Sequence, residues 1–265
     1  MNNIDSTAIV SPDAVLGDGV KVGAYALVEG RARIGDGSVI EPHARVCGGA
    51  RIGKGCRICS FTVVSGDPQD LHFDASLETF AEIGDGSVVR ESATIHRATF
   101  EGKATIVGRN CLIMASAHIG HDCVLGDNVI LANFSACAGH VKVANDAFIS
   151  GGVMVHQRVR IGEGVIISGN AATSLDVPPF VIAYARNNVG GLNLIGMNRR
   201  RMPREDISEV KRLYSEVYAT PAARKNALAI LESGNVRTAA GRKFLEFFTV
   251  ENRHYIIPRG NNHLD

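Results

Sequence analysis

Aliphatic residues recur at every sixth position along the first quarter of the chain. They stand at Val10, Leu16, Val22, Val28, Ile34, Ile40, Val46, Ile52, Ile58 and Val64. Four residues after most of them comes a compact residue, such as Ala26 or Cys56. After a break the period resumes, one residue out of phase, at Ile83 and continues to Ile167, with one irregular step at Glu101.

A period of six matches neither the 3.6-residue helix nor the two-residue alternation of a strand. It predicts short strands joined by sharp turns, with three hexads, or about 18 residues, in each triangular coil. The aliphatic residues would fill the interior, and the compact ones would let the chain round a corner. Glycine after the aliphatic residue, as at Gly17 and Gly35, would supply turn conformations that a Cβ penalises. A β-sandwich is the alternative, but it would not keep one period for so long.

Two interruptions divide the chain. Residues 66–80 form a polar insertion, and insertions in a solenoid usually become loops on one face, often the binding face. Two prolines in the segment 176–179 lack ladder donors, so we expect the repeat to stop there. We therefore predict a β-helix domain over 1–190 and a helical domain over 191–265.

Three helices are expected in the tail. An apolar stripe from Ile207 to Val217 predicts the first. Thr220 and Pro221 suggest the N-cap and first turn of the second, which would stop at Ser233-Gly234. The third would carry Phe244, Leu245, Phe247 and Phe248. Such helices would cover the open end of the solenoid.

Composition narrows the class of protein. The net charge of +1 gives no global sign of nucleic-acid or membrane-surface binding. Neither a signal peptide nor an apolar run long enough to span a membrane is visible, so a cytoplasmic protein without stable membrane insertion is expected. Aromatic residues make up 6% of the chain and Trp is absent, so the core must be narrow and aliphatic.

Candidate chemistry lies outside the repeat's interior positions. The segment 117–123 turns Ile119 and Cys123 inward, so His118, His121 and Asp122 should face outward. His140 and His156 follow at steps of 19 and 16 residues, close to one coil each. The three histidines at 121, 140 and 156 should therefore lie along one edge. A histidine can accept a proton from an attacking hydroxyl near neutral pH, and Asp122 could fix its tautomer.

A metal site is the competing interpretation of these histidines. Hexapeptide carbonic anhydrases bind zinc through a histidine followed much later by a His-x4-His pair. Here the close pair is His118-x2-His121, and no His-x4-His occurs. We therefore expect no metal.

Motifs spread over most of the chain resemble the UDP-N-acetylglucosamine O-acyltransferase family of lipid A synthesis. They are Gln69-Asp70-Leu71, Thr94-Ile95-His96-Arg97, 117–123, Asn133, Ala138-Gly139-His140, Val155-His156-Gln157, 176–179, Gly191-Leu192-Asn193 and Arg199-Arg200. The resemblance implies a left-handed parallel β-helix followed by a C-terminal α-helical domain. It also implies transfer of a 3-hydroxyacyl group to the sugar 3-hydroxyl.

The same resemblance assigns roles to the motifs. His121 would be the general base, beside Asp122, and the Gly139 N–H would stabilise the oxyanion. The substrate-binding residues would be Gln69, Asp70, His72, His96, His118, Asn133, His140, His156, Gln157, Arg199 and Arg200. Gly169 occupies the position that limits acyl length.

The resemblance also implies partners. The acyl donor would be acyl carrier protein with its phosphopantetheine arm, the acceptor would be UDP-N-acetylglucosamine, and no other cofactor would be needed. Family members are homotrimers with sites between adjacent β-helices, so two chains should build each site.

Two departures from the family pattern stand out. His72 replaces a common Lys, which exchanges a fixed charge for a weakly basic ring. Arg201-Met202-Pro203 follows the paired arginines where the family often has Gly-Phe. Whether the acceptor carries a 3-hydroxyl or a 3-amino group stays open.

Three rivals remain. The N-acyltransferase of the same pathway carries a globular domain before its repeats, whereas these begin by Val10. Another hexapeptide acyltransferase, using acetyl-CoA, would not need the Gln-Asp-Leu insertion or the tail. A hexapeptide scaffold protein without catalysis would have no need to keep His121, Gly139 and His156 together.

Overall fold

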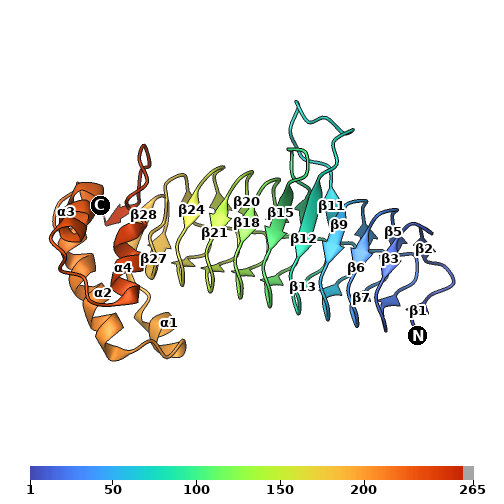
Figure 1. Ribbon diagram of the computed structural model, residues 1–265, viewed down its shortest axis with the longest axis horizontal. Coiled ribbons are helices and arrows are strands. Elements are labelled where there is room, and N and C mark those ends of the chain that lie inside the picture. The colour runs from blue at the N-terminus through green and yellow to red at the C-terminus, as the bar shows by residue number, and fades with distance from the viewer. Residues whose placement is uncertain (259–265) are drawn as a thin grey trace.

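The computed structural model describes residues 1–258 and shows a long coil of short strands with α-helices at its C-terminal end (Figure 1). The chain passes from sheet A to sheet B to sheet C and back again, so each circuit adds one strand to every face. Within the solenoid all pairings are parallel, as in Ile95 with Ile119 and Ile119 with Cys137. The fold is the left-handed parallel β-helix, followed by helices, that the sequence predicts.

Successive strands of the solenoid belong in turn to sheets A, B and C. Sheet A contains β1 (Asn3–Ile4), β4 (Lys21–Val22), β7 (Val39–Ile40), β10 (Arg57–Ile58), β13 (Val88–Val89), β16 (Leu112–Ile113), β19 (Ile130–Leu131), β22 (Phe148–Ile149), β25 (Ile166–Ile167), β27 (Val181–Tyr184), β28 (Asn188–Leu192) and β29 (Ile257–Pro258). Sheet B contains β2 (Ile9–Val10), β5 (Leu27–Val28), β8 (Arg45–Val46), β11 (Val63–Gly66), β14 (Thr94–His96), β17 (His118–Ile119), β20 (Ala136–Cys137), β23 (Met154–Val155) and β26 (Ala172–Thr173). Sheet C contains β3 (Val15–Leu16), β6 (Arg33–Ile34), β9 (Ala50–Ile52), β12 (Phe80–Ile83), β15 (Ala104–Val107), β18 (Val124–Leu125), β21 (Lys142–Val143) and β24 (Arg160–Ile161).

The periodic residues form the interior, as predicted. Ile40, Ile95 and Ile119 are fully buried, and the compact residues, such as Ala26 and Cys56, are buried beside them. Only the first coil, with Val10 and Leu16 half-buried, is open to solvent at its end. Each buried aliphatic side chain contributes about 1.5–3 kcal/mol, so stacking many similar coils yields a stable core without large rings.

The reason for the repeated glycines differs from the one expected. Gly17 and Gly35 do not have positive φ; instead a Cβ there would lie 2.4 to 2.8 Å from atoms of the next coil. These glycines therefore permit close stacking of the coils. The left-handed conformation falls two residues later, at Gly19 and Gly37, or at non-glycine residues such as Asn128.

The turns stack into three edges that run along the solenoid. The B–C edge joins sheet B to sheet C and includes 121–122, 139–140 and 157–158. The A–B edge includes 133–134, 151–152 and 169–170, and the C–A edge includes 127–128, 145–146 and 163–164.

Two long segments interrupt the B–C edge on successive coils. The insertion, residues 67–79, joins β11 to β12 and projects from the rod in Figure 1. In the next coil residues 97–103 join β14 to β15, and this second excursion causes the irregular step at Glu101. Both precede the turn that holds His121 and Asp122, so the insertion shares an edge with the candidate catalytic residues.

The expected end of the solenoid at residues 176–179 is wrong by one strand. After the prolines β27 still pairs in parallel with β25, and β28 then turns back antiparallel to it. The prolines are tolerated because they precede β27 and so remove no donor from it. β29, from the C-terminal segment, pairs with β28.

Up to residue 258 the tail contains the three predicted helices and one more. They are α1 (Leu194–Arg199), α2 (Arg204–Val217), α3 (Ala223–Glu232) and α4 (Ala239–Glu246). The predicted N-cap at Thr220 is wrong: α3 starts after Ala222, and the Thr220 hydroxyl instead accepts hydrogen bonds from the Ala222 N–H and the Asn226 side chain. Gly234, with φ of 71°, follows the α3 C-cap as expected. Phe247 and Phe248 lie just past α4.

One buried carboxylate fastens the tail to the solenoid. Asp176 is 2% exposed and accepts hydrogen bonds from the guanidinium groups of Arg160, 2.7 Å away, and Arg253, 2.9 Å away. Its backbone also pairs with the strand around Tyr255. Because these contacts join the tail to the solenoid, the two form no clearly separate domains, and a domain boundary at residue 190 stays a prediction. None of the helices over residues 1–258 combines the length and apolar character needed to cross a membrane.

Candidate active site

His121 and Asp122 form a hydrogen-bonded pair at the B–C edge. The His121 Nδ1 lies 2.8 Å from the Asp122 Oδ2, and both side chains are largely buried. Burial raises the pKa of the Asp122 carboxyl, but hydrogen bonds from Thr99 and His121 outweigh it and hold that pKa below its ordinary value. An ionised carboxylate at Nδ1 favours the tautomer whose Nε2 can accept a proton. His121 and Asp122 are adjacent in the sequence, which alone does not show that their side chains touch; the structure shows this contact.

His140 stands over this pair on the next coil. Its ring centroid is 5.1 Å from that of His121, and its Nε2 is 3.8 Å from the Asp122 Oδ2. The left-handed backbone at Asp122 and His140, with φ near 60° at both, repeats the same turn and brings the rings together. Burial, with smaller contributions from Arg158 and His121, lowers the pKa of His140, although Asp122 opposes the shift. His140 is consequently neutral at physiological pH.

A second histidine pair lies on sheet B beside the first. His118 Nδ1 is 2.8 Å from the Thr94 hydroxyl, and its ring meets that of His96 edge to face at 4.9 Å. Burial lowers the pKa of both rings, that of His96 to about 4. The His96 Nδ1 is buried without a hydrogen-bond partner among the described residues. Both rings therefore act as neutral donors or acceptors.

The insertion adds a carboxylate to the cluster. The Asp70 Oδ1 accepts a hydrogen bond from the His72 backbone N–H, the main cause of a lowered Asp70 pKa, and nearby His121 contributes to the shift. The His72 side chain is 93% exposed, with Nδ1 3.6 Å from Asp70. Gln69 is exposed beside them.

Gly139 lies directly against the ring of His121. A Cβ at this position would be 2.5 Å from the His121 Cε1 and 2.6 Å from its Nε2. Real Cβ atoms do not come this close, so any larger residue would displace the imidazole. The Gly139 N–H donates none of the described backbone hydrogen bonds and so can serve a bound group.

Several predicted residues do not join the cluster within one chain. His156 follows β23 in register with Ala138 rather than His140, so the step of 16 residues leaves it exposed and displaced from the histidine stack. Gln157 lies on the B–C edge one coil beyond Gly139. Asn133 and Gly169 lie on the A–B edge and are exposed.

The two arginines lie on yet another part of the surface. The Arg200 guanidinium is 3.4 Å from Glu163 and 3.6 Å from Asp146, both on the C–A edge, and packs over the Phe180 ring. Arg199 is exposed at the end of α1. Their predicted role in substrate binding therefore requires a site that extends beyond one chain.

A metal could reach the same central groups. Ligand atoms of His121, Asp122 and His140 lie within 4.8 Å of one another. The Asp122 Oδ2, however, already accepts a hydrogen bond from the Thr99 hydroxyl at 2.7 Å while facing His121 Nδ1. This geometry orients a basic imidazole and leaves that oxygen little capacity for an ion.

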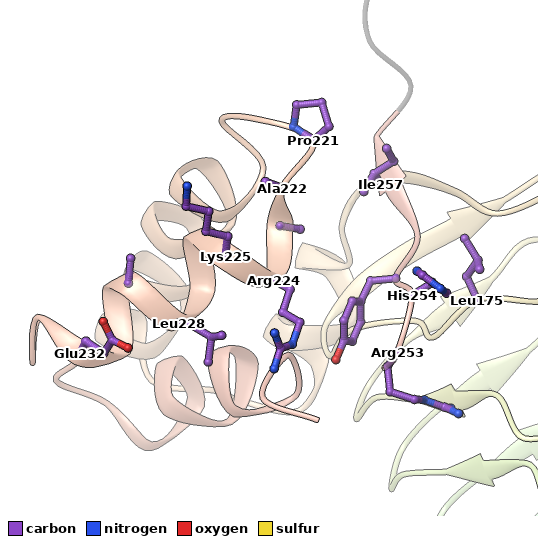
Figure 2. A pocket seen from close by; sticks show the side chains of 13 residues that line it. Leu175, Pro221, Ala222, Arg224, Lys225, Leu228, Glu232, Arg253, His254 and Ile257 are labelled. Atoms are coloured by element: carbon purple, nitrogen blue, oxygen red, sulfur yellow. The ribbon is translucent and has the colours of Figure 1, made fainter. Parts of the chain in front are cut away.

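Two grooves lie in the C-terminal half of the chain. One of about 280 Å³ crosses the outer face of sheet B, with Ala136, Met154 and Ala172 forming its floor and His156 at its rim. Figure 2 shows another, of about 840 Å³, between α3 and the C-terminal strand, where Arg224 and Lys225 stand beside apolar side chains.

The sequence analysis assigned no role to three residues that contact the site or its loops: Thr94, Arg97 and Thr99. The only sign of the excursion that carries Thr99 was the irregular step at Glu101. A hydroxyl in a loop has no periodic signature, so its contact with Asp122 required the structure.

Comparisons with known proteins agree on one group. A family model described as UDP-N-acetylglucosamine O-acyltransferase, domain 2, matches residues 176–256, and a bacterial transferase hexapeptide model matches 31–66 and 104–139. An acyl-[acyl-carrier-protein]–UDP-N-acetylglucosamine O-acyltransferase of Pseudomonas putida is 44% identical over 256 residues, covering 91% of this chain and 99% of that protein. One of Campylobacter concisus is 40% identical over 220 residues, covering 82% of this chain and 84% of that protein.

Solved structures give the same result. The UDP-N-acetylglucosamine acyltransferase of Campylobacter jejuni superposes with a TM-score of 0.90 at 35% identity, covering 97% of this chain and all of that one. The similarity therefore includes both the solenoid and the helical tail.

The low pKa of His96 predicts acid-sensitive stability. In the unfolded chain His96 takes up a proton below about pH 6.5, whereas in the folded protein its ring stays neutral down to about pH 4. The contribution of neutral His96 to the free energy of unfolding is therefore full above pH 6.5 and decreases as the pH falls toward 4. Acidification from pH 7.5 to pH 5 should therefore lower the free energy of unfolding by about 2 kcal/mol through His96. Urea titrations of wild type and His96→Gln check this. Equal losses in both proteins on acidification would contradict it, and the values at pH 7.5 serve as the reference.

Proposed function

The chain belongs to the UDP-N-acetylglucosamine O-acyltransferase family, and from that membership we infer that it transfers an acyl group from acyl carrier protein to UDP-N-acetylglucosamine, the first step of lipid A biosynthesis. The observation that carries the mechanism is the His121–Asp122 pair, with Gly139 against its ring. A non-catalytic scaffold is not favoured, because it would gain nothing from burying a carboxylate beside neutral imidazoles.

His121 acts as the general base in this proposal. Its Nε2 takes the proton from the sugar 3-hydroxyl, and the oxygen attacks the carbonyl carbon of the 3-hydroxyacyl thioester. The Asp122 carboxylate, bound to Nδ1, stabilises the imidazolium that forms. When the tetrahedral intermediate collapses, the C–S bond breaks and His121 returns the proton to the departing thiol. No covalent acyl-enzyme is needed.

The Gly139 N–H supplies the oxyanion contact. It lies beside the base, so one small volume contains both the proton acceptor and the donor for developing negative charge. A donor of this kind typically contributes on the order of 3 kcal/mol to the transition state. Neutral His140, 5.1 Å from the His121 ring, borders the same volume and would lie beside the thioester.

The acceptor sugar nucleotide is held by groups around the base. Asp70 from the insertion and His118 from sheet B flank His121 and can bind sugar hydroxyls, while His96 backs the His118 ring. His72 replaces a fixed charge with an exposed imidazole, so contact with the nucleotide there would be weaker. Attack by a 3-amino group would need less help from a base; the His121–Asp122 pair favours the hydroxyl acceptor.

The acyl chain lies on the outer face of sheet B. His118, Ala136, Met154 and Ala172 follow one another in register across that face, so an apolar strip begins next to the cluster. Gly169 lies on the A–B edge, which borders the same face. This arrangement supports its role in limiting acyl length.

Each site combines two chains of a homotrimer. Asn133 and the arginines 199 and 200 lie on edges that do not contain His121, so one chain cannot bring them to its own base. A neighbouring chain can present those edges to the cluster. Because both substrates are water-soluble molecules made inside the cell, a cytoplasmic location is part of the proposal, and cell fractionation would test it.

The trimer predicts a solution mass three times that of the 28.2 kDa chain. Size-exclusion chromatography with light scattering measures it directly. A fully active monomer at assay concentration would contradict the shared site.

Replacement of the base should abolish turnover. His121→Ala should lower the transfer of radiolabelled 3-hydroxyacyl groups from acyl carrier protein to UDP-N-acetylglucosamine by about 100-fold or more. Gly139→Ala should cause a loss of similar size by displacing the imidazole. The matched control is His43→Ala, since that ring stacks on Phe61 on the A–B edge, away from the cluster. Product formation by His121→Ala at the wild-type rate would remove His121 from its role, and no product from folded wild type would reject the function.

A larger residue at position 169 should shorten the preferred acyl group. A Cβ there meets nothing closer than 3.4 Å and φ is not positive, so Gly169→Met should fold normally. Competition between donors of different chain length, each on acyl carrier protein, measures the preference. Ala24→Met, at the equivalent turn position near the N-terminus, is the control. An unchanged preference in Gly169→Met would reject the role of Gly169.

A further inference from the structure

The excursion over residues 97–103 contacts the catalytic carboxylate from outside its own coil. The Thr99 hydroxyl donates to Asp122 Oδ2 at 2.7 Å, and the Thr99 backbone N–H lies 3.2 Å from Oδ1. Asp122 Oδ2 is also the atom that faces His121 Nδ1. The carboxylate is thus held by Thr99 on one side while it orients the base on the other.

The same excursion is attached firmly to the insertion. The Glu101 side chain accepts a hydrogen bond from the Glu78 N–H at 2.8 Å, and the Gly102 N–H donates to the Glu78 carbonyl at 2.9 Å. Arg97, whose side chain is only 11% exposed, donates to Asp67 and to the Leu77 carbonyl, both at 2.9 Å. Thr99 therefore belongs to a braced segment.

The Thr99 contact comes from an irregular connection between sheet B and sheet C. At 121–122 or 139–140 two residues suffice to pass from sheet B to sheet C. The longer path over 97–103 brings a hydroxyl to Asp122 from the coil beneath. The departure from the hexad period thus has a chemical consequence at the base.

We propose that Thr99 is a positioning residue for catalysis: its hydroxyl fixes the Asp122 carboxylate in the orientation and charge state that His121 requires. The proposal rests on the assignment of His121 as general base. Thr99 does not contact the reacting atoms; it acts through the carboxylate alone.

Electrostatics support this role. Four ionisable groups face the Asp122 carboxylate or the rings beside it: His121 on the same turn, His140 on the next coil, Arg158 beyond it and Asp70 from the insertion. Burial alone raises the pKa of Asp122, and hydrogen bonds to the carboxylate reverse that shift. Without the Thr99 hydroxyl, burial would be less opposed and the carboxylate would protonate at higher pH.

The test compares Thr99→Val with Thr99→Ser in the full chain. The Val variant keeps the shape and the backbone hydrogen bonds but lacks the hydroxyl, whereas Ser restores it. A hydrogen bond to a charged group corresponds to about a 10-fold effect, so kcat should fall about 10-fold in Thr99→Val, with KM for the sugar nucleotide nearly unchanged. The acid limb of its pH profile should move to higher pH, and Thr99→Ser should restore both kcat and the profile.

Thr62→Val provides the matched control. Its buried hydroxyl donates to the Arg90 carbonyl at 3.0 Å in the N-terminal half, so it also loses a hydroxyl contact but has none with the site. It should alter unfolding temperature and leave the pH profile as in wild type. A Thr99→Val profile identical to wild type, or a Thr99→Ser variant as impaired as Thr99→Val, would overturn the positioning role. Absence of turnover in folded wild type would instead overturn the proposed function.

A measurement without substrate further separates the positioning role of Thr99 from the proposed function. In ¹⁵N-histidine spectra the His121 signal, assigned by its loss in His121→Ala, reports which ring nitrogen carries the proton. Thr99→Val should change the tautomer balance of that signal, and Thr99→Ser should not. An unchanged His121 signal in Thr99→Val would overturn the proposal whatever the acceptor proves to be.

Discussion

Direct stacking of one coil on the next is the constraint on which the rest of the structure depends. Each strand inside the solenoid hydrogen-bonds to the strand one coil above and one coil below, so backbone atoms of adjacent coils lie too close for a Cβ at many turns. The same closeness that excludes a side chain at Gly35 places the ring of His121 directly against Gly139. The geometry of the candidate site thus follows from the stacking that builds the core, because each turn, with the side chains on it, is positioned by the neighbouring coils.

Much of the fold could be predicted from the sequence because the hexad period is a physical consequence of the triangular coil. The interior residues, the insertion and the α2 helix were all visible in that period or in a simple apolar stripe. Features that depend on one specific contact were not. The glycines suggested turn conformations when the real cause was a neighbouring coil, Thr220 resembled an N-cap but binds elsewhere, and the prolines permitted one more strand because they precede it.

The residues of the candidate site likewise fall into those that the repeat could place and those that it could not. Counting in coils grouped His121, His140 and His156 along one edge, and of these three the structure brings together the rings of His121 and His140. The expectation for His156 was wrong, and the family resemblance had also assigned Asn133 to the same site. Asn133 is two hexads beyond His121, hence on another edge, and the step of 16 residues moves His156 out of register. The arginines lie outside the repeat, where no period can place them; the structure puts Arg199 at the end of α1 and Arg200 against Glu163.

The candidate catalytic residues lie at the edge where the period fails, and there is a structural reason for this. A regular turn contains too few residues to enclose a substrate, so a perfect solenoid presents only shallow faces. The insertion over 67–79 and the excursion over 97–103 leave the B–C edge on successive coils and brace each other through Glu78 and Glu101. One brings Asp70 toward the base, and the other brings Thr99 to its carboxylate. The regular coils therefore provide rigidity, and the two irregular ones provide depth and polar contacts that the hexad pattern itself cannot.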